Sequence, residues 1–267
     1  MSFNKSKCKV LRISRKSSPT DLHLPFTMTN LHQNEIHYLE ESRSERDLGV
    51  QITHNLKWDE QVKIASAKAN KALGTLTRTF KCWDLRMVKQ LFSIYVRPHL
   101  EYAASAWNPY NQLHINKIER VQFRATRLVP SLKTLEYDQR LAELGLTTLE
   151  DRRTRGDAIQ LFKCTKRMNM VEFIHKWHSQ NEHIAPAAPA ANTRRNHWLL
   201  KQKLNLQQRN KFFTNRAVDV WNSLPISTHS SKTVNSFKNS YDRHKSVFKN
   251  RANPNATTTR LMLTSIP

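Results

Sequence analysis

Glycine is scarce in this chain, with only 4 among 267 residues. So few glycines leave little room for tight turns, exclude a glycine-rich phosphate loop and favour helices. Acidic residues are also few: 21 Asp and Glu stand against 44 Lys and Arg, which gives a formal net charge of +23. This balance argues against an ordinary small-metabolite enzyme. It predicts a polyanionic partner, with nucleic acid ahead of an anionic membrane surface.

The sequence also lacks the patterns of metal sites, disulfide frameworks and membrane spans. Cys8, Cys82 and Cys164 lie far apart, form no CxxC pair and have no histidine at zinc-finger spacing, so neither a metal nor a cofactor is expected. No run of about 18 apolar residues and no signal-peptide core occurs, so we expect no membrane partner and no secretion. The expected location is intracellular, with nucleus and cytoplasm both open.

Clustered carboxylates for two-metal phosphoryl transfer are missing, because no Asp-Asp dipeptide occurs. The adjacent acidic pairs are Glu40-Glu41, Asp59-Glu60 and Glu150-Asp151. The last two fall at predicted helix starts, where acids interact favourably with the helix dipole. No hydrolase nucleophile, P-loop or zinc-protease motif is found either. We therefore predict no catalytic residue in this chain.

Alternating hydropathy predicts three short strands in the first 55 residues. They are Lys9–Ile13, Leu22–Met28 and Asp47–Thr53, with Gly49 as a candidate bulge. We expect these strands to pair with one another as a small antiparallel sheet.

After residue 58 the apolar period becomes helical. Asp59 is a candidate N-cap, and the apolar residues that follow at spacings of three and four are Val62, Ala65, Ala69, Leu73, Leu76 and Phe80. Asp84 is expected to cap a second helix that stops or kinks at Pro98 and whose apolar side holds Leu85, Val88, Leu91 and Tyr95. Further helices are predicted at 98–107, 112–128, 135–144, 148–168, 211–223 and 233–248.

The predicted fold class is α+β and predominantly α: small N-terminal antiparallel strands, then a helical bundle, then a second small helical segment. We expect strands over 1–55, a helical region over 56–184, an Ala/Pro-rich linker over 185–197, a basic helical segment over 198–250 and a disordered tail over 251–267. Residues 158–267 hold 18 basic and 4 acidic residues, a net +14, whereas residues 1–157 hold 26 and 17, a net +9. The positive charge is therefore concentrated toward the end of the chain.

Two predicted helices carry basic rows opposite their apolar stripes. The rows are Lys68, Lys71 and Arg78 in the first helix and Lys117, Arg120, Arg124 and Arg127 in the helix at 112–128. The second row spans about 80° of arc at helical pitch. Either these side chains solvate the outside of a bundle or they contact phosphates. Together they are the predicted nucleic-acid-binding residues.

Three tryptophans are candidate platforms for base stacking: Trp83, Trp107 and Trp221. Each adjoins an apolar stripe or a helix end, which favours packing over stacking. For Trp107 and the RPHLEY segment (97–102) before it, we expect a structural role, with Leu100 and Tyr102 packed.

Four segments stand out in order along the chain: ERDLGVQITHNLKWDEQV (45–62), KANKALGTLTRTFK (68–81), SIYVRPHLEYAASAWNPY (93–110) and KIERVQFRATRLVP (117–130). The segments FNKSKCKVLRIS (3–14), LTTLEDRRTRGDAIQLFK (146–163) and FFTNRAVDVWNSLP (212–225) extend the set. In this order they resemble the C-terminal part of the reverse transcriptases of non-LTR (LINE-type, jockey-like) retrotransposons.

This resemblance implies that residues 1–55 are the last palm strands, with the hairpin that grips the primer end. Residues 59 to about 130 would be the helical thumb, which holds the template–primer duplex (RNA or RNA/DNA), and residues beyond 146 the post-polymerase region. The catalytic Asp-Asp strand of the family would lie upstream of residues 3–14. The expected protein is therefore a truncated fragment that binds nucleic acid through basic helix faces and lacks its own catalytic carboxylates. Two alternatives remain: an RNA-directed DNA polymerase whose active site is supplied elsewhere, and a non-functional pseudogene product.

Overall fold

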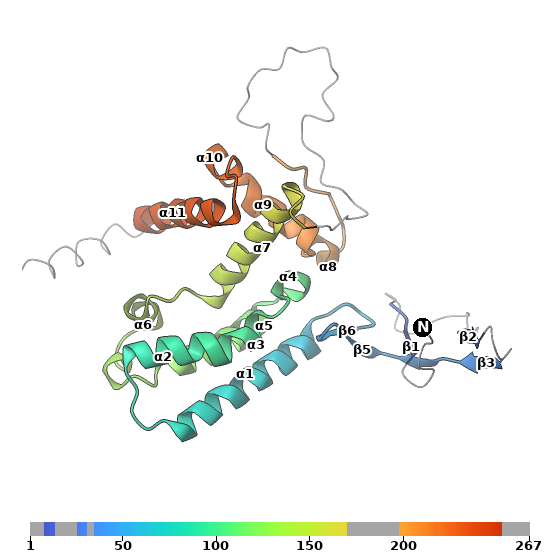
Figure 1. Cartoon of the computed structure of the whole chain (residues 1–267), viewed down its shortest axis with the longest axis horizontal. Helices are drawn as coiled ribbons and strands as arrows, with labels where there is room; N and C mark the ends of the chain where they lie inside the picture. The colour runs from blue at the N-terminus through green and yellow to red at the C-terminus, as the bar shows by residue number, and fades with distance from the viewer. Residues whose placement is uncertain (1–7, 14–25, 31–34, 170–197, 253–267) are drawn as a thin grey trace, which may run out of the picture. The chain divides into compact units, whose positions relative to one another are not determined.

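The computed structural model describes residues 8–13, 26–30, 35–169 and 198–252 (Figure 1). The chain divides into two compact units, residues 1–149 and 150–267. Short strands precede a series of helices, so the predicted class, α+β and predominantly α, is confirmed. The predicted linker at 185–197 lies outside the described residues, as does the expected tail beyond residue 252.

In the described part of the first unit, short strands form two-stranded pairs. Strand β1 (Lys9–Leu11) pairs in parallel with β4 (Glu40–Ser42). The antiparallel pairs are β2 (Thr27–Asn30) with β3 (Glu35–Tyr38), and β5 (Ser44–Asp47) with β6 (Val50–Thr53). The expectation that the three predicted strands pair with one another is therefore wrong. Two of them instead find partners across short loops, which cost less chain entropy to close than long ones.

The β5–β6 hairpin turns through two residues with positive φ, Leu48 at 44° and Gly49 at 87°. Two positive φ values are typical of the type I′ turn, whose twist matches that of the flanking strands. Gly49 thus lies in the turn and not at the predicted bulge. A Cβ atom on Gly49 would lie 3.1 Å from the ring of Tyr102, whose hydroxyl donates a 2.9 Å hydrogen bond to the carbonyl oxygen of Leu48. The turn therefore requires glycine for both its backbone and its packing.

Leu48 stands in a conformation that suits asparagine better than leucine. It is 86% exposed, so its side chain contributes little by burial. We expect Leu48→Asn to raise the free energy of unfolding by about 0.5–1 kcal/mol, because asparagine adopts positive φ at lower cost. Denaturant titration would measure the gain. The control Leu113→Asn changes an exposed leucine within a helix, where asparagine has the lower propensity, and should not stabilise. Equal effects of the two substitutions would contradict the prediction.

Helices α1 (Asp59–Thr79) and α5 (Gln112–Thr126) bury their predicted apolar stripes in one core. The buried members are Val62, Ala65, Ala69 and Leu73 of α1 and Ile118, Val121 and Ala125 of α5. The predicted N-cap of α1 is wrong, because the cap position is Trp58 and makes no side-chain cap hydrogen bond. Asp59 lies in the first turn, and its Oδ1 is 2.7 Å from Nε2 of His114.

Helix α2 (Leu85–Leu91) continues into a π-helical turn, η2 (Phe92–Val96), and then into α3 (Arg97–Glu101). Asp84 caps α2 as predicted, since its carboxylate accepts a 2.6 Å hydrogen bond from the amide of Met87. The helical geometry changes just before Pro98, which has no N–H to donate to the preceding turn.

The π turn rotates the apolar side of this helix away from the predicted stripe. The amide of Arg97 bonds to the carbonyl of Phe92, five residues back, so the turn holds one extra residue. Within and after this turn Phe92 and Val96 are buried, whereas Tyr95 is 54% exposed. Leu85, the first residue of α2, is also exposed, although it precedes the π turn. The prediction that Leu85 and Tyr95 face the core is therefore wrong.

Trp107 closes the short helix α4 (Ala104–Trp107), which follows a residue at positive φ, Ala103. Its side chain is fully buried in the core of α1 and α5, and its indole N–H donates a 2.7 Å hydrogen bond to the carbonyl of Tyr102. Leu100 is also fully buried, whereas Tyr102 is 57% exposed and packs against the β5–β6 turn. The predicted structural role of Trp107 is confirmed.

A second apolar cluster completes the first unit. The short helix η3 (Pro130–Leu132) and helix α6 (Tyr137–Leu144) contribute to it, and its buried members are Val88, Val129, Leu132 and Leu144. Gly145 ends α6 at a φ of 57°, in the left-handed conformation expected of a C-terminal glycine.

The second unit is formed by α7 (Leu149–Thr165), which enters it from the first, and by α8 (Gln207–Asn210), α9 (Phe213–Asn222), α10 (Ile226–His229) and α11 (Val234–Ala252). Its core stacks Phe162 on Phe237, with ring centroids 4.4 Å apart, and Phe237 near Trp221 at 6.2 Å. Arg216 of α9 pairs with the buried Asp157 of α7 at 2.8 and 3.0 Å. The NRAVDVWNSLP segment thus serves packing within this unit.

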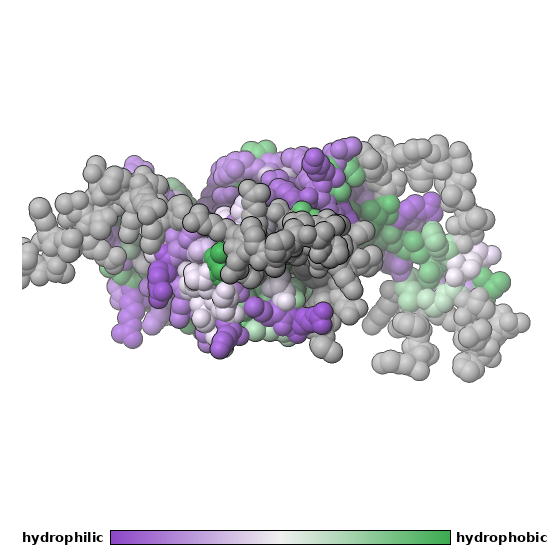
Figure 2. Space-filling view, turned by 90° about the horizontal axis from the view of Figure 1, so that it is seen from above, coloured by the Kyte–Doolittle hydropathy of each residue, from purple (hydrophilic) through white to green (hydrophobic). Residues whose placement is uncertain are grey.

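Hydrophilic residues predominate on the described surface in the view of Figure 2. Among the described residues, no helix is both long and apolar enough to cross a membrane.

Candidate nucleic-acid interface

Helices α1 and α5 lie side by side and run in the same direction (Figure 1). Two contacts define this alignment: Asp59 meets His114 near the helix starts, and further along Arg124 donates a hydrogen bond to the side-chain oxygen of Asn70. Both contacts fall on one seam between the two helices. Lys63 lies seven residues, or two helical turns, before Asn70, and Lys117 lies seven residues before Arg124. These two lysines therefore lie on the seam faces of α1 and α5, between the two contacts along the helices.

All seven predicted binding residues are exposed, but they do not form one row. Lys117 and Arg124 lie on the seam side of α5, whereas Arg120 and Arg127 lie further round its outer face. Lys71 and Arg78 occupy the outer face of α1, opposite its buried stripe. Lys68 lies on the far flank of α1, beside α3. The structure thus brings six of the seven to the outer side of the helix pair and directs Lys68 elsewhere.

The acidic side chains of α1 and α5 do not neutralise these cations. Asp59 is bonded to His114, Glu60 accepts a hydrogen bond from Ser44, and Glu119 bonds toward the interior. Within the described ranges, none of the seven predicted residues forms an ion pair. The outer side of the α1–α5 pair therefore keeps an uncompensated positive charge.

Glu119 builds a polar network beneath the basic surface. Its carboxylate accepts hydrogen bonds from the amide of Leu149 at 2.9 Å, from the hydroxyl of Tyr137 at 2.5 Å and from the amide of Gln122 at 3.3 Å. The fully buried Gln122 also donates to the carbonyl of Thr147 at 3.0 Å. The acidic and amide residues of KIERVQFRATRLVP thus fix α5 to α6 and to the start of α7.

Tyr137 provides a pH test of this network. Burial, followed by the hydrogen bond and charge of Glu119, raises the pKa of Tyr137. Because its folded pKa lies above the unfolded value of about 10, the stability it contributes is complete below about pH 10 and is lost as the pH rises further. We expect the loss of unfolding free energy in Tyr137→Phe to be largest near neutral pH and to shrink in more alkaline buffer. Denaturant titrations across this range measure it, and a difference that stays constant would exclude the network as described.

Arg140 adds positive charge near the end of α5. Its guanidinium lies 4.4 Å from the ring centre of Phe123 and 5.6 Å from that of Tyr137, as in cation–π contacts. Burial, followed by the nearby charge of Arg127, lowers the pKa of Arg140. Arg140 is only 2% exposed, so its charge lies beneath the exposed Arg127 and not on the outer surface itself.

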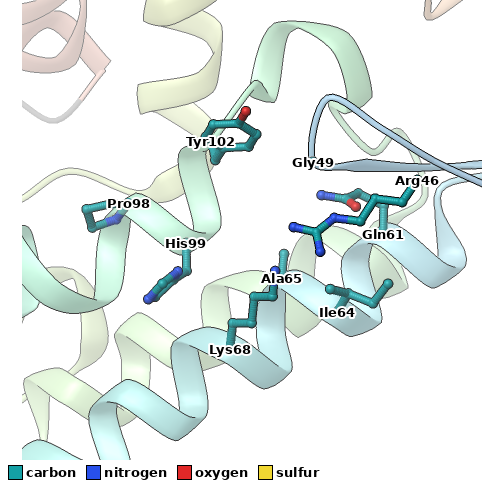
Figure 3. Close-up of a pocket in the computed structure, with 9 residues that line it drawn as sticks. All are labelled: Arg46, Gly49, Gln61, Ile64, Ala65, Lys68, Pro98, His99 and Tyr102. Atoms are coloured by element: carbon teal, nitrogen blue, oxygen red, sulfur yellow. The ribbon is translucent and has the colours of Figure 1, made fainter. Parts of the chain in front are cut away.

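A cavity of about 310 Å³ opens on the other flank of α1 (Figure 3). Arg46 of β5, Lys68 of α1 and His99 of α3 line it, together with Gln61, Gly49 and Tyr102. The remaining lining residues are apolar, and none of the nine is acidic. This is where the predicted residue Lys68 lies, apart from the other six.

Sequence reasoning missed four residues of these surfaces: Lys63 on the seam and Arg46, Gln61 and His99 in the cavity. Gln61 carried a signal, because it is a polar residue at a position where α1 faces the core. Lys63 falls between the apolar stripe and the basic row. Arg46 and His99 gave no signal, since only the pairing of β5 and the π turn before α3 determine where they lie.

The three candidate stacking tryptophans serve packing to different degrees. Trp107 and Trp221 are buried in the cores of the first and second units respectively. Trp83 is half-buried, and its ring lies 6.1 Å from that of Phe80 in an edge-on contact.

Comparison with known proteins gives one weak similarity. An uncharacterized protein of Caenorhabditis elegans is 24% identical over 110 residues, which cover 40% of this chain and 56% of that protein. The match thus spans little more than half the length of that relative. No family model matches the chain, and no solved structure matches it.

Proposed function

We propose that the first unit binds a nucleic-acid duplex through the outer side of the α1–α5 pair. We call this the basic surface and define it as Lys63, Lys71, Arg78, Lys117, Arg120, Arg124 and Arg127. The observation that carries the proposal is the lack of any ion pair at these side chains within the described residues, while the acids of the same helices bond elsewhere. A bundle that needed its cations only for solvation would have no reason to keep them apart from its carboxylates.

The mechanism of binding is electrostatic. Lysine and arginine side chains on two parallel helices contact backbone phosphates and release the counterions condensed on the duplex. Such contacts set the position of the duplex without reading its sequence. Binding is therefore sequence-tolerant and strongly dependent on salt.

The resemblance to a reverse-transcriptase thumb supports a duplex as the partner. The segments KANKALGTLTRTFK and KIERVQFRATRLVP form most of α1 and α5, the two helices that carry the basic surface. By this resemblance we propose that the duplex is RNA or an RNA/DNA hybrid and that the chain is related to the C-terminal part of non-LTR retrotransposon reverse transcriptases. No catalytic step is proposed for the residues of this chain.

The test is the salt dependence of duplex binding by the full chain. A fluorescently labelled RNA/DNA hybrid is titrated with protein at several salt concentrations, and binding is followed by anisotropy. We expect the logarithm of the binding constant to fall linearly with the logarithm of the salt concentration, by about 0.9 for each phosphate contacted. The absence of binding at low salt, or binding that does not change with salt, would refute the proposal.

A further inference from the structure

The cavity between β5, α1 and α3 has a different chemistry from the basic surface. It presents several hydrogen-bond donors, from the guanidinium of Arg46, the ammonium of Lys68, the imidazole of His99 and the amide of Gln61. In Figure 3, Arg46 and Lys68 end on the same side of the cavity, and His99 and Tyr102 approach from α3. A cavity rich in donors and free of lining carboxylates suits a ligand rich in acceptor oxygens.

Gln61 adds a donor whose orientation the structure fixes. It is only 5% exposed, and its side-chain oxygen accepts a 2.9 Å hydrogen bond from the backbone amide of Gln51. Because a backbone N–H can only donate, this contact fixes which end of the Gln61 amide is oxygen. The NH₂ group must then point the other way, and Figure 3 shows it on the side of the Arg46 guanidinium. Among the described residues this NH₂ group makes no hydrogen bond that the structure shows, and Gln61 is one of the residues that line the cavity.

The walls of the cavity include flat, apolar surfaces. Pro98 and Tyr102 line it, and Tyr102 is held in place by its hydroxyl bond to Leu48 and by its ring contact with Gly49. Aromatic rings that are fixed in advance bind the face of a base at little entropic cost. With a volume of about 310 Å³, the cavity is at the small end of ligand sites.

We propose that this cavity binds one phosphate-bearing nucleotide of an unpaired strand. Arg46, Lys68 and the amide of Gln61 would hold the phosphate, while His99 and Tyr102 flank the base. A phosphate can contact the amide of Gln61 only from within the cavity. A flexible single strand can bend into the cavity more easily than a rigid duplex can. The proposal rests on the proposed nucleic-acid binding and adds a second subsite, which selects the unpaired part of the ligand.

Two variants test the cavity without relying on the basic surface. Gln61→Glu keeps an oxygen acceptor for the amide of Gln51 but replaces the donor with a carboxylate that repels phosphate. Lys68→Gln removes one cation from an exposed position, so the fold should be unaffected. Lys133→Gln is the control, because it removes the same charge from an exposed residue of the first unit outside both surfaces.

The experiment compares a labelled oligothymidine with a duplex of the same length, each titrated against the full chain and followed by anisotropy. We expect Gln61→Glu and Lys68→Gln to weaken binding of the single strand roughly tenfold or more, while duplex binding changes less than threefold, as after Lys133→Gln. Thermal melting checks that each variant is folded. If Gln61→Glu does not fold, Lys68→Gln alone decides the test.

Two results would overturn the cavity proposal: unchanged single-strand binding in a folded variant, or equal losses for the single strand and the duplex. Inorganic phosphate as a competitor gives a further check, since it should displace the single strand from wild type more readily than from Lys68→Gln. Failure of the proposed function looks different. In that case the chain shows no salt-dependent binding of the duplex, whereas Gln61→Glu still weakens binding of the single strand.

Discussion

Replacing Trp107 by alanine is expected to lower the free energy of unfolding by about 3–5 kcal/mol. The indole is fully buried between α1 and α5, so its removal leaves a cavity as well as a loss of apolar burial. It also takes away the 2.7 Å hydrogen bond to the carbonyl of Tyr102, which ends α3. Denaturant unfolding of the variant and of wild type would measure the difference.

Trp107→Phe separates the two contributions to this loss, the burial of the ring and the hydrogen bond of the N–H group. Trp83→Ala is the control at a less buried tryptophan. Phenylalanine restores most of the buried ring and loses the N–H donor, so its cost should be well below that of alanine. Trp83 is only half-buried at the edge of another cluster, and its truncation should cost less than that of Trp107. A Trp107→Ala protein of wild-type stability that no longer binds nucleic acid would instead show that this residue contacts the ligand.

The helices were largely predictable because their signals are local. The period of three and four in α1 and α5, the cap at Asp84 and the glycine after α6 all depend on neighbouring residues. The predictions were wrong where the structure depends on a local change of helical geometry or on contacts between residues distant in the sequence. The π turn before Pro98 shifts the buried side of the helix by one residue, and strand pairing depends on loops that hydropathy does not encode.

The candidate interface was predictable as a set of exposed cations but not as a surface. Helical pitch places Lys68 and Lys71 together opposite the apolar stripe, whereas the neighbouring α3 separates Lys68 into the cavity. The contact of Arg124 with Asn70 could not be inferred either, because it requires the parallel alignment of α1 and α5. Sequence patterns thus identify which residues face outward, and tertiary packing decides which of them meet.

Neutralising Arg120, Arg124 and Arg127 together by glutamine is expected to reduce the steepness of the salt dependence of duplex binding by up to about 3, near one unit for each phosphate that the variant no longer neutralises. A fourfold rise in salt would then weaken wild type about 40-fold more than the variant, since four raised to the power 2.7 is close to 40. Stability should change little, because the three side chains are exposed. Among the described residues, Arg124 and Arg127 make only two side-chain interactions that the variant would lose. They are the hydrogen bond from Arg124 to Asn70 and the contact of the Arg127 guanidinium with the ring of Phe123.

The matched control removes three exposed cations from the second unit: Arg209, Arg243 and Lys245. Both variants lose the same net charge. A long-range effect of charge alone would therefore change the slope of log binding constant against log salt concentration equally in both. If phosphates contact α5, only the first variant has a shallower slope. An unchanged slope in the α5 variant would mean that its arginines merely solvate the helix. A shallower slope in the control alone would then move duplex binding to the basic segment after residue 198.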